Sequence, residues 1–114
     1  MRYGFVNVAA AVPMVKVADV AYNVEQIKSL ITQADSQNVE VIVFPELCIT
    51  GYTCQDLFKE QLLLDQAEQG IVQLLDFSRK LGIVSIVGLP LIINGLLYNC
   101  AVVLQAGQVL GVNR

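Results

Sequence analysis

The sequence predicts an α/β fold built on a mixed sheet, and three observations support this prediction. In the first two thirds of the chain, strand-length apolar segments alternate with longer segments of helical periodicity. Two turn dipeptides, Asn94-Gly95 and Ala106-Gly107, then divide the last third into apolar strands. The 114 residues leave room for one small domain at most. We therefore expect a single sheet that starts parallel and continues antiparallel.

The first half of the chain contains two predicted strands around one predicted helix. Residues 3–12 are largely apolar and form the first strand. An amphipathic helix follows, with Asp19 or Asn23 as its N-cap. Residues 41–44 form a β-branched second strand, and Pro45 stops it because proline cannot donate to a sheet ladder. The helix is predicted from an apolar stripe at Val20, Val24, Ile27, Ile31 and Ala34.

The second half begins with helical sequence from about residue 57 to residue 81. Gly70 predicts a break into two helices, and Gly82 is a suitable residue to follow the helix end. Residues 83–89 are almost continuously apolar, as in a strand covered on both faces. Residues 91–93 and 96–105 form a hairpin, since Asn-Gly supplies the two positive φ angles of a type I′ turn, and the second turn leads into a last strand.

Composition indicates that the chain packs against something else. Hydrophobic residues make up 55% of it and charged residues only 15%, with a mean hydropathy of +0.61. A free-standing domain of this size has a large surface to keep wet and needs more polar residues. Either a large partner covers the chain, or it is a piece of a longer protein.

Charge and hydropathy argue against nucleic-acid and membrane partners. The net charge is −3, and no cluster of Lys and Arg is present to bind phosphates or anionic lipids. Residues 81–113 carry no formal charge and are long enough to span a bilayer. Gly88, Pro90 and Asn94-Gly95 nevertheless divide this segment into strand-length pieces, which favours a sheet. We expect a cytoplasmic protein.

Cysteine and histidine usage restricts the possible chemistry. Cys48, Cys54 and Cys100 are odd in number and widely spaced, so neither a disulfide framework nor a metal site is predicted. The chain has no histidine, which removes imidazole acid–base and Ser-His-Asp catalysis from it. None of the cysteines has a basic neighbour in sequence that would activate it as a nucleophile. Proton transfer must therefore use Glu, Asp, Lys, Tyr or Cys.

Glu46 is the candidate catalytic residue. It directly follows the predicted strand and Pro45, at the strand end where ligands bind in parallel α/β sheets. Apolar neighbours should raise the pKa of its carboxyl, which suits a general base near neutral pH. The alternative is a structural carboxylate that caps the following loop. Tyr52 in that loop either binds substrate and orients Glu46 or only packs, while Lys16 and Lys59 are expected in solvent.

The strand-end motif also carries a family resemblance. Phe44-Pro45-Glu46-Leu47 with Thr50-Gly51-Tyr52 resembles the first motif of the nitrilase, or carbon–nitrogen hydrolase, superfamily. Within it, the chain is similar to the N-terminal glutaminase domain of the glutamine-dependent NAD synthetase family. This likeness extends over essentially the whole chain, through residues 4–11, 17–23, 47–54, 56–58, 87–90 and 97–101.

The resemblance implies that residues 1–114 are the N-terminal portion of a single, incomplete glutaminase domain with an α-β-β-α sandwich fold. It implies a Glu-Lys-Cys mechanism in which a cysteine attacks the side-chain amide of glutamine and releases ammonia. Glu46 matches the general base of this set, and Tyr52 is expected to be a substrate-binding residue. The family's lysine and nucleophilic cysteine belong to motifs beyond the equivalent of residues 111–112. The 114 residues alone are therefore expected to be inactive.

The resemblance further implies a set of partners. The glutaminase part needs no cofactor, whereas ATP and Mg²⁺ would serve a C-terminal synthetase domain that amidates nicotinic acid adenine dinucleotide to NAD. The expected partners are glutamine, the remainder of the chain with its synthetase domain, and further copies in a homo-oligomer. Two alternatives remain: the start of a stand-alone nitrilase-type amidase, and a non-catalytic α/β interaction module in which Glu46 is structural.

Overall fold

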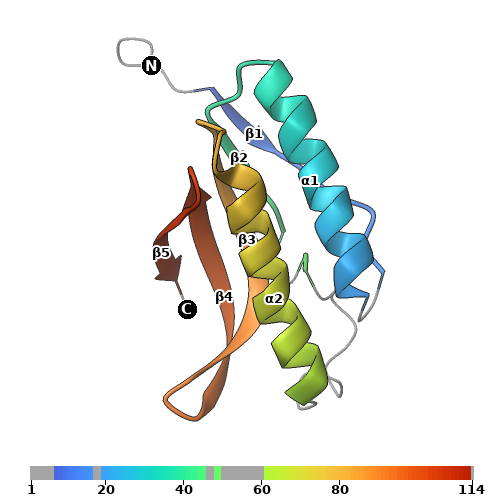
Figure 1. Cartoon of the computed structure of the whole chain (residues 1–114), viewed down its shortest axis with the longest axis vertical. Helices are drawn as coiled ribbons and strands as arrows, with labels where there is room; N and C mark the ends of the chain where they lie inside the picture. Colours follow the sequence, from blue (N-terminus) through green and yellow to red (C-terminus); the bar gives the residue numbers. More distant parts are fainter. Residues whose placement is uncertain (1–6, 17–18, 46–47, 50–60, 114) are drawn as a thin grey trace.

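The computed structural model of the 114-residue chain describes residues 7–16, 19–45, 48–49 and 61–113. Two helices lie against one face of a five-stranded sheet (Figure 1). The helices are α1 (Val20–Ser36) and α2 (Gln61–Ser78). The strands are β1 (Val8–Ala10), β2 (Val41–Val43), β3 (Val84–Ile93), β4 (Leu96–Gln105) and β5 (Gln108–Asn113).

The sheet is mixed, as predicted from the sequence. Its strands follow chain order, with β1, β2 and β3 parallel and β4 and β5 added antiparallel. Because β5 runs antiparallel to β4, it points the same way as β2 and β3. Strands β2 and β5 end beside the middle of β3 and β4, since Val43 pairs with Ile86 and Asn113 with Ala101, and the β3–β4 hairpin extends beyond them.

Helix α1 begins at one of the two N-cap residues that the sequence predicted. The Asp19 carboxylate accepts a hydrogen bond from the Tyr22 backbone N–H at 3.1 Å, so Asp19 is the N-cap and Asn23 lies inside the helix. The helix ends just before Asn38, which has the left-handed φ of 63° that such ends favour. The predicted apolar stripe is confirmed, since all five of its members are buried: Val20, Val24, Ile27, Ile31 and Ala34.

Helix α2 corrects two predictions about glycines. The helix runs unbroken through Gly70, so the predicted division there is wrong. A Cβ on Gly70 would lie 3.0 Å from Val20 Cγ1 and 3.1 Å from Val24 Cγ2, and the missing side chain thus allows α1 to approach closely. Gly82 is not the helix-ending residue, because α2 ends at Ser78 and Gly82 has no positive φ.

The last three strands form two hairpins with turns of the expected kind. Asn94 and Gly95 have φ angles of 53° and 80°, and Ala106 and Gly107 have 50° and 80°, as a type I′ turn requires. Strand β3 is longer than predicted and continues through Pro90. Proline is tolerated there because β2 pairs with β3 only over residues 84–86, so no described strand continues the ladder beside Pro90 on that side.

The two faces of the sheet differ in their cover. The helix-facing side holds the core, including Ile42, Val87 and Leu104. On the opposite side, cross-strand neighbours from β2, β3 and β4 are apolar but only half-buried. We call this surface the open face, and its central residues are Val41, Val43, Val84, Ile86 and Val103. The sequence predicted that residues 83–89 are covered on both faces. Among the described elements, the helices cover one of these faces and no element covers the other.

No helix in the described residues is both long and apolar enough to cross a bilayer.

The regular elements account for most of the described chain, and the core forms where α1 and α2 pack on β2, β3 and β4. The fold therefore leaves two surfaces for function: the outer side of the helices and the open face of the sheet.

Two buried serines give a matched test of the core. Ser85 is 1% exposed between Ile42 and Leu104, and its hydroxyl has no hydrogen-bond partner among the described residues. Ser78 is also buried, but its hydroxyl donates to Leu75 O and accepts from Gly107 N. Ser85→Ala should raise the free energy of unfolding by about 1 kcal/mol, whereas Ser78→Ala should lower it by about 1 kcal/mol. Urea unfolding followed by circular dichroism measures both, and a loss with Ser85→Ala equal to that with Ser78→Ala would contradict this account.

Candidate functional site

A cavity of about 210 Å³ lies on the open face where β2 ends. Pro45 forms one wall, and Asn99 and Asn113 bring side-chain amides from β4 and β5. Gly88 contributes no side chain, which leaves room above β3. We call this the strand-end cavity, and its lining consists of Val43, Phe44, Pro45, Ile86, Val87, Gly88, Asn99, Cys100, Ala101 and Asn113.

The predicted site residues Glu46 and Tyr52 lie outside the described residues, as do Cys54 and Lys59. Their assigned roles stay predictions. The structure does describe the chain on both sides of Glu46. Pro45, its predecessor, lines the strand-end cavity, so the candidate base is attached directly to the cavity wall.

The chain is anchored again two residues after Glu46. The Ile49 backbone N–H donates to Gly88 O at 3.2 Å. The Gly88 N–H donates to the Cys48 sulfur at 3.5 Å, and the Cys48 thiol donates in turn to Gly88 O at 3.8 Å. Cys48 and Ile49 are fully buried. The two residues between Pro45 and Cys48 therefore connect positions that are both fixed against β3.

Asn23 anchors the same segment from the helix side. Its side chain is fully buried, donates to Lys16 O and Ile49 O at 2.8 Å each, and accepts from Lys16 N–H at 2.7 Å. It thus joins the loop before α1 to the segment that follows the candidate base. The sequence analysis did not predict this role. A signal for it was present, because Asn23 is a polar residue three positions after Val20, on the buried stripe of the helix.

The described cysteines and Lys16 agree with the predictions made for them. Burial raises the pKa of the Cys48 thiol from 9.0 to about 11, partly offset by the Gly88 backbone hydrogen bond. Cys100 is also buried, in β4. A cysteine nucleophile needs a lowered pKa and access, which Cys48 lacks. Lys16 is exposed, with its ammonium 4.2 Å from the centre of the Tyr22 ring.

No group of three His, Cys, Asp or Glu side chains within the described ranges could hold a metal ion. The strand-end cavity has a lining without formal charge, and amides are its polar groups. Such a lining can orient a carboxylate or a polar substrate by hydrogen bonds. The chemistry itself must come from groups that adjoin the cavity, of which Glu46 is the one next in sequence to its wall.

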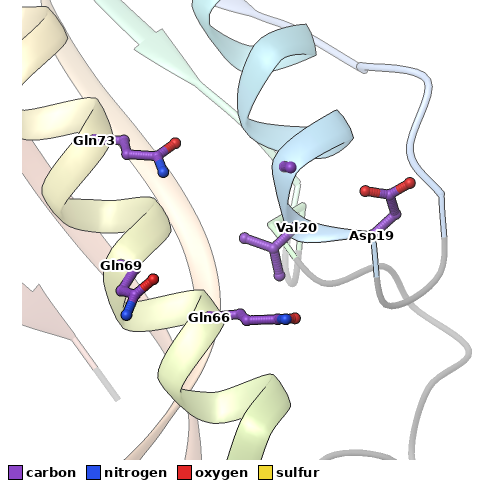
Figure 2. Close-up of a pocket in the computed structure, with 6 residues that line it drawn as sticks. Asp19, Val20, Gln66, Gln69 and Gln73 are labelled. Atoms are coloured by element: carbon purple, nitrogen blue, oxygen red, sulfur yellow. The ribbon is translucent and has the colours of Figure 1, made fainter.

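A second, larger pocket of about 420 Å³ lies on the outer side of the helices. Figure 2 shows Gln66, Gln69 and Gln73 along α2, with Gln66 extending towards Val20 and Asp19 at the start of α1. Glutamine amides have no acid–base function, and the Asp19 carboxylate already caps α1. This pocket therefore offers weaker grounds for a catalytic site than the strand-end cavity.

Comparison with known proteins defines the class to which this fold and site belong. The sequence profile of the carbon-nitrogen hydrolase family matches residues 7–114. This chain therefore belongs to the carbon-nitrogen hydrolase family. An amidase from Nesterenkonia has the same fold, with a TM-score of 0.78 at 20% identity over 96% of this chain and 42% of that chain.

More similar proteins carry a more particular name. The chain is 36% identical over 109 residues to the glutamine-dependent NAD(+) synthetase of Mycobacterium leprae, covering 96% of this chain and 16% of that protein. It is 37% identical over 106 residues to the Xylella fastidiosa protein of the same name, covering 92% and 19%. The crystal structure of the Cytophaga hutchinsonii synthetase gives a TM-score of 0.87 at 33% identity, over 94% of this chain and 18% of that chain. The chain thus spans less than a fifth of the length of these relatives.

The Asn23 anchor can be tested by removing its amide. Asn23→Ala removes the donors to the buried Ile49 carbonyl and the part-buried Lys16 carbonyl and should lower the free energy of unfolding by about 3 kcal/mol. Thr32→Ala is the control on the same helix, since its exposed hydroxyl makes only a local bond to Lys28 O, and it should change stability by less than about 0.5 kcal/mol. Urea unfolding compares the two, and equal small effects would show that Asn23 is not an anchor.

The raised pKa of Cys48 predicts an unreactive thiol. At pH 8 a thiol with a pKa of about 11 is ionised to the order of 0.1%, and burial limits access further. Cys48 in the folded protein should therefore resist iodoacetamide, while the urea-unfolded protein should react fully. Peptide mass spectrometry reports the modified residue. Alkylation of native Cys48 at the unfolded rate would contradict both the burial and the pKa.

Proposed function

We propose that this chain forms part of the glutaminase portion of a glutamine-dependent NAD(+) synthetase. The observation that carries the proposal is the 36% identity to a protein of that name over 96% of the chain. The stand-alone amidase with the same fold has only 20% identity, which favours the synthetase over the amidase alternative. In this function, glutamine is hydrolysed to glutamate, and the ammonia is used to amidate nicotinic acid adenine dinucleotide.

Glu46 is the general base in this proposal. It takes the proton from a cysteine thiol, and the thiolate attacks the side-chain carbonyl of glutamine. The C–N bond then breaks, ammonia leaves with a proton returned to it, and a thioester remains. Glu46 next takes a proton from water, whose oxygen attacks the thioester and releases glutamate and the thiol. The lysine and cysteine of this set come from the remainder of the chain.

The anchored geometry around Glu46 supports this role. A general base must be held within hydrogen-bond reach of the proton that it takes. Pro45 on one side and Cys48 on the other are fixed against β2 and β3, and Asn23 holds the Ile49 carbonyl. In this proposal Tyr52 binds glutamine.

The open face supports the proposal that further chain covers this sheet. Its apolar side chains from β1 to β4 are half-buried or exposed, including Val8 at 64%, and a surface of this kind gains free energy when it is covered. In a nitrilase-type sandwich the second sheet would pack here. The proposal also includes a C-terminal synthetase domain that uses ATP and Mg²⁺, a homo-oligomer, and a cytoplasmic location. Residues 1–114 alone should have no glutaminase activity.

The role of Glu46 can be separated from folding in the complete protein. Glu46→Gln keeps the size of the side chain but removes the base, so glutamine-dependent NAD synthesis should fall by at least about 10²-fold. Synthesis from added ammonia should stay near the wild-type rate, because it bypasses the glutaminase site. Coupled assays with the two nitrogen sources measure this ratio. Equal loss of both activities would assign Glu46 to the fold instead.

A further inference from the structure

The register of the strands explains the shape of the strand-end cavity. Val43, Ile86 and Val103 lie side by side on the open face, across β2, β3 and β4. In the next row of the same face, Gly88 lies opposite Ala101. A row of three branched side chains is thus followed by a missing side chain and a single methyl group. The cavity of about 210 Å³ lies over this second row, where the sheet is hollowed.

Two side-chain amides border the cavity. Asn113 of β5 lies opposite Ala101 in the same row, and Asn99 lies one row further along β4, opposite Pro90. Both project from the open face, because paired residues and residues two apart on a strand share a face. Both also line the cavity and are exposed. Diagonal neighbours on adjacent strands lie about 7–8 Å apart, so one small group between these amides can hydrogen-bond both.

The polar atoms of both amides are available to a ligand. Gln105, at the other end of this face, donates its amide N–H to Gly82 O at 2.8 Å. Neither Asn99 nor Asn113 makes a side-chain hydrogen bond within the described part of the chain. A carboxamide carries N–H donors and a carbonyl acceptor. The cavity wall therefore offers both donors and acceptors.

The absence of charge from the cavity lining favours one kind of ligand. None of the lining residues is Asp, Glu, Lys or Arg. A charged ammonium or carboxylate loses its hydration in such a cavity and meets no opposite charge, which is costly. A neutral carboxamide costs less to desolvate, and its N–H and C=O groups match those of an asparagine amide. Glutamine has charged groups at its α-carbon and a neutral carboxamide at the end of its side chain.

We propose that the strand-end cavity is the subsite for the side-chain carboxamide of glutamine, which Asn99 and Asn113 hold by hydrogen bonds. The proposal rests on the glutaminase function proposed above. It gives both asparagines a role in specificity, because the product glutamate brings a charge to the same place and has no N–H to donate. A site built on hydrogen bonds to a substrate N–H discriminates strongly against an analogue that lacks it. The amide substrate is therefore favoured over the acid product.

The test uses the complete protein and measures kcat and KM for glutamine, together with the inhibition constant Ki for glutamate. Asn99→Leu and Asn113→Leu keep the approximate size of the side chain but remove its hydrogen bonds, so each should raise KM about fivefold. Ki for glutamate should rise less than about twofold, because a carboxylate makes fewer bonds to an amide. Gln108→Leu is the control. Gln108 lies on the same face, opposite Gln105 and outside the cavity, so both constants should stay unchanged.

Filling the cavity gives a second test that removes no polar group. Ala101→Val adds two methyl groups to the floor of the cavity, in a strand where β-branched residues are favoured. It should raise KM for glutamine at least about tenfold, because the carboxamide and the added methyl groups compete for the same space. Ammonia-dependent NAD synthesis should stay near the wild-type rate, since it bypasses this subsite.

Three outcomes would overturn the proposal. One is an unchanged KM for glutamine in active Asn99 and Asn113 variants. Another is an equal rise in KM for glutamine and Ki for glutamate, because the amides would then hold the part that both molecules share. Loss of ammonia-dependent synthesis in parallel would assign the asparagines to folding. Absence of glutaminase activity in the wild-type protein would instead refute the proposed function itself, so the two failures are distinguishable.

Discussion

The buried side chain of Asn23 joins parts of the chain that no regular element connects. Its amide and carbonyl bind Lys16 on one side and Ile49 on the other. A buried amide stabilises only when its hydrogen bonds are made, so this residue allows one arrangement of the two loops and penalises others. Because α1 carries Asn23, the packing of that helix on the sheet determines where the chain runs after Glu46. The position of the Ile49 backbone therefore depends on the core.

The one-sided helix layer has a further consequence. Both helices bury the same face of the sheet, and the centre of the open face is also apolar. A strand covered on both faces reads as a continuous apolar run, and residues 83–89 have that pattern. The sequence thus encodes a second layer that the described residues do not supply. The strand-end cavity lies on the face that this layer would cover, which explains how a solvent-facing cavity in this chain can become a closed site.

Much of the fold could be predicted because local signals determine it. The periodic stripe of α1, the Asn94-Gly95 turn and the change from parallel to antiparallel strands depend on neighbours in sequence, and the structure confirms them. The errors at Gly70 and Gly82 have a different origin. Gly70 is required by Val20 and Val24 on another helix, a contact that outweighs its low helix propensity. The role of Asn23 was not predicted for the same reason, since its partners are brought together only by the tertiary structure.

The polar side chains of the strand-end cavity are amides, and this limits what the described residues can do to a neighbouring carboxylate. A nearby cation would hold a carboxylate ionised but weaken it as a base, and a nearby anion would keep it protonated. An amide donates a hydrogen bond without adding charge, so it changes the proton affinity of a carboxylate less. The chain has no histidine and few charges, and the described cavity lining has none. Strong electrostatic control of a carboxylate beside this cavity would therefore have to come from charged groups outside the described lining.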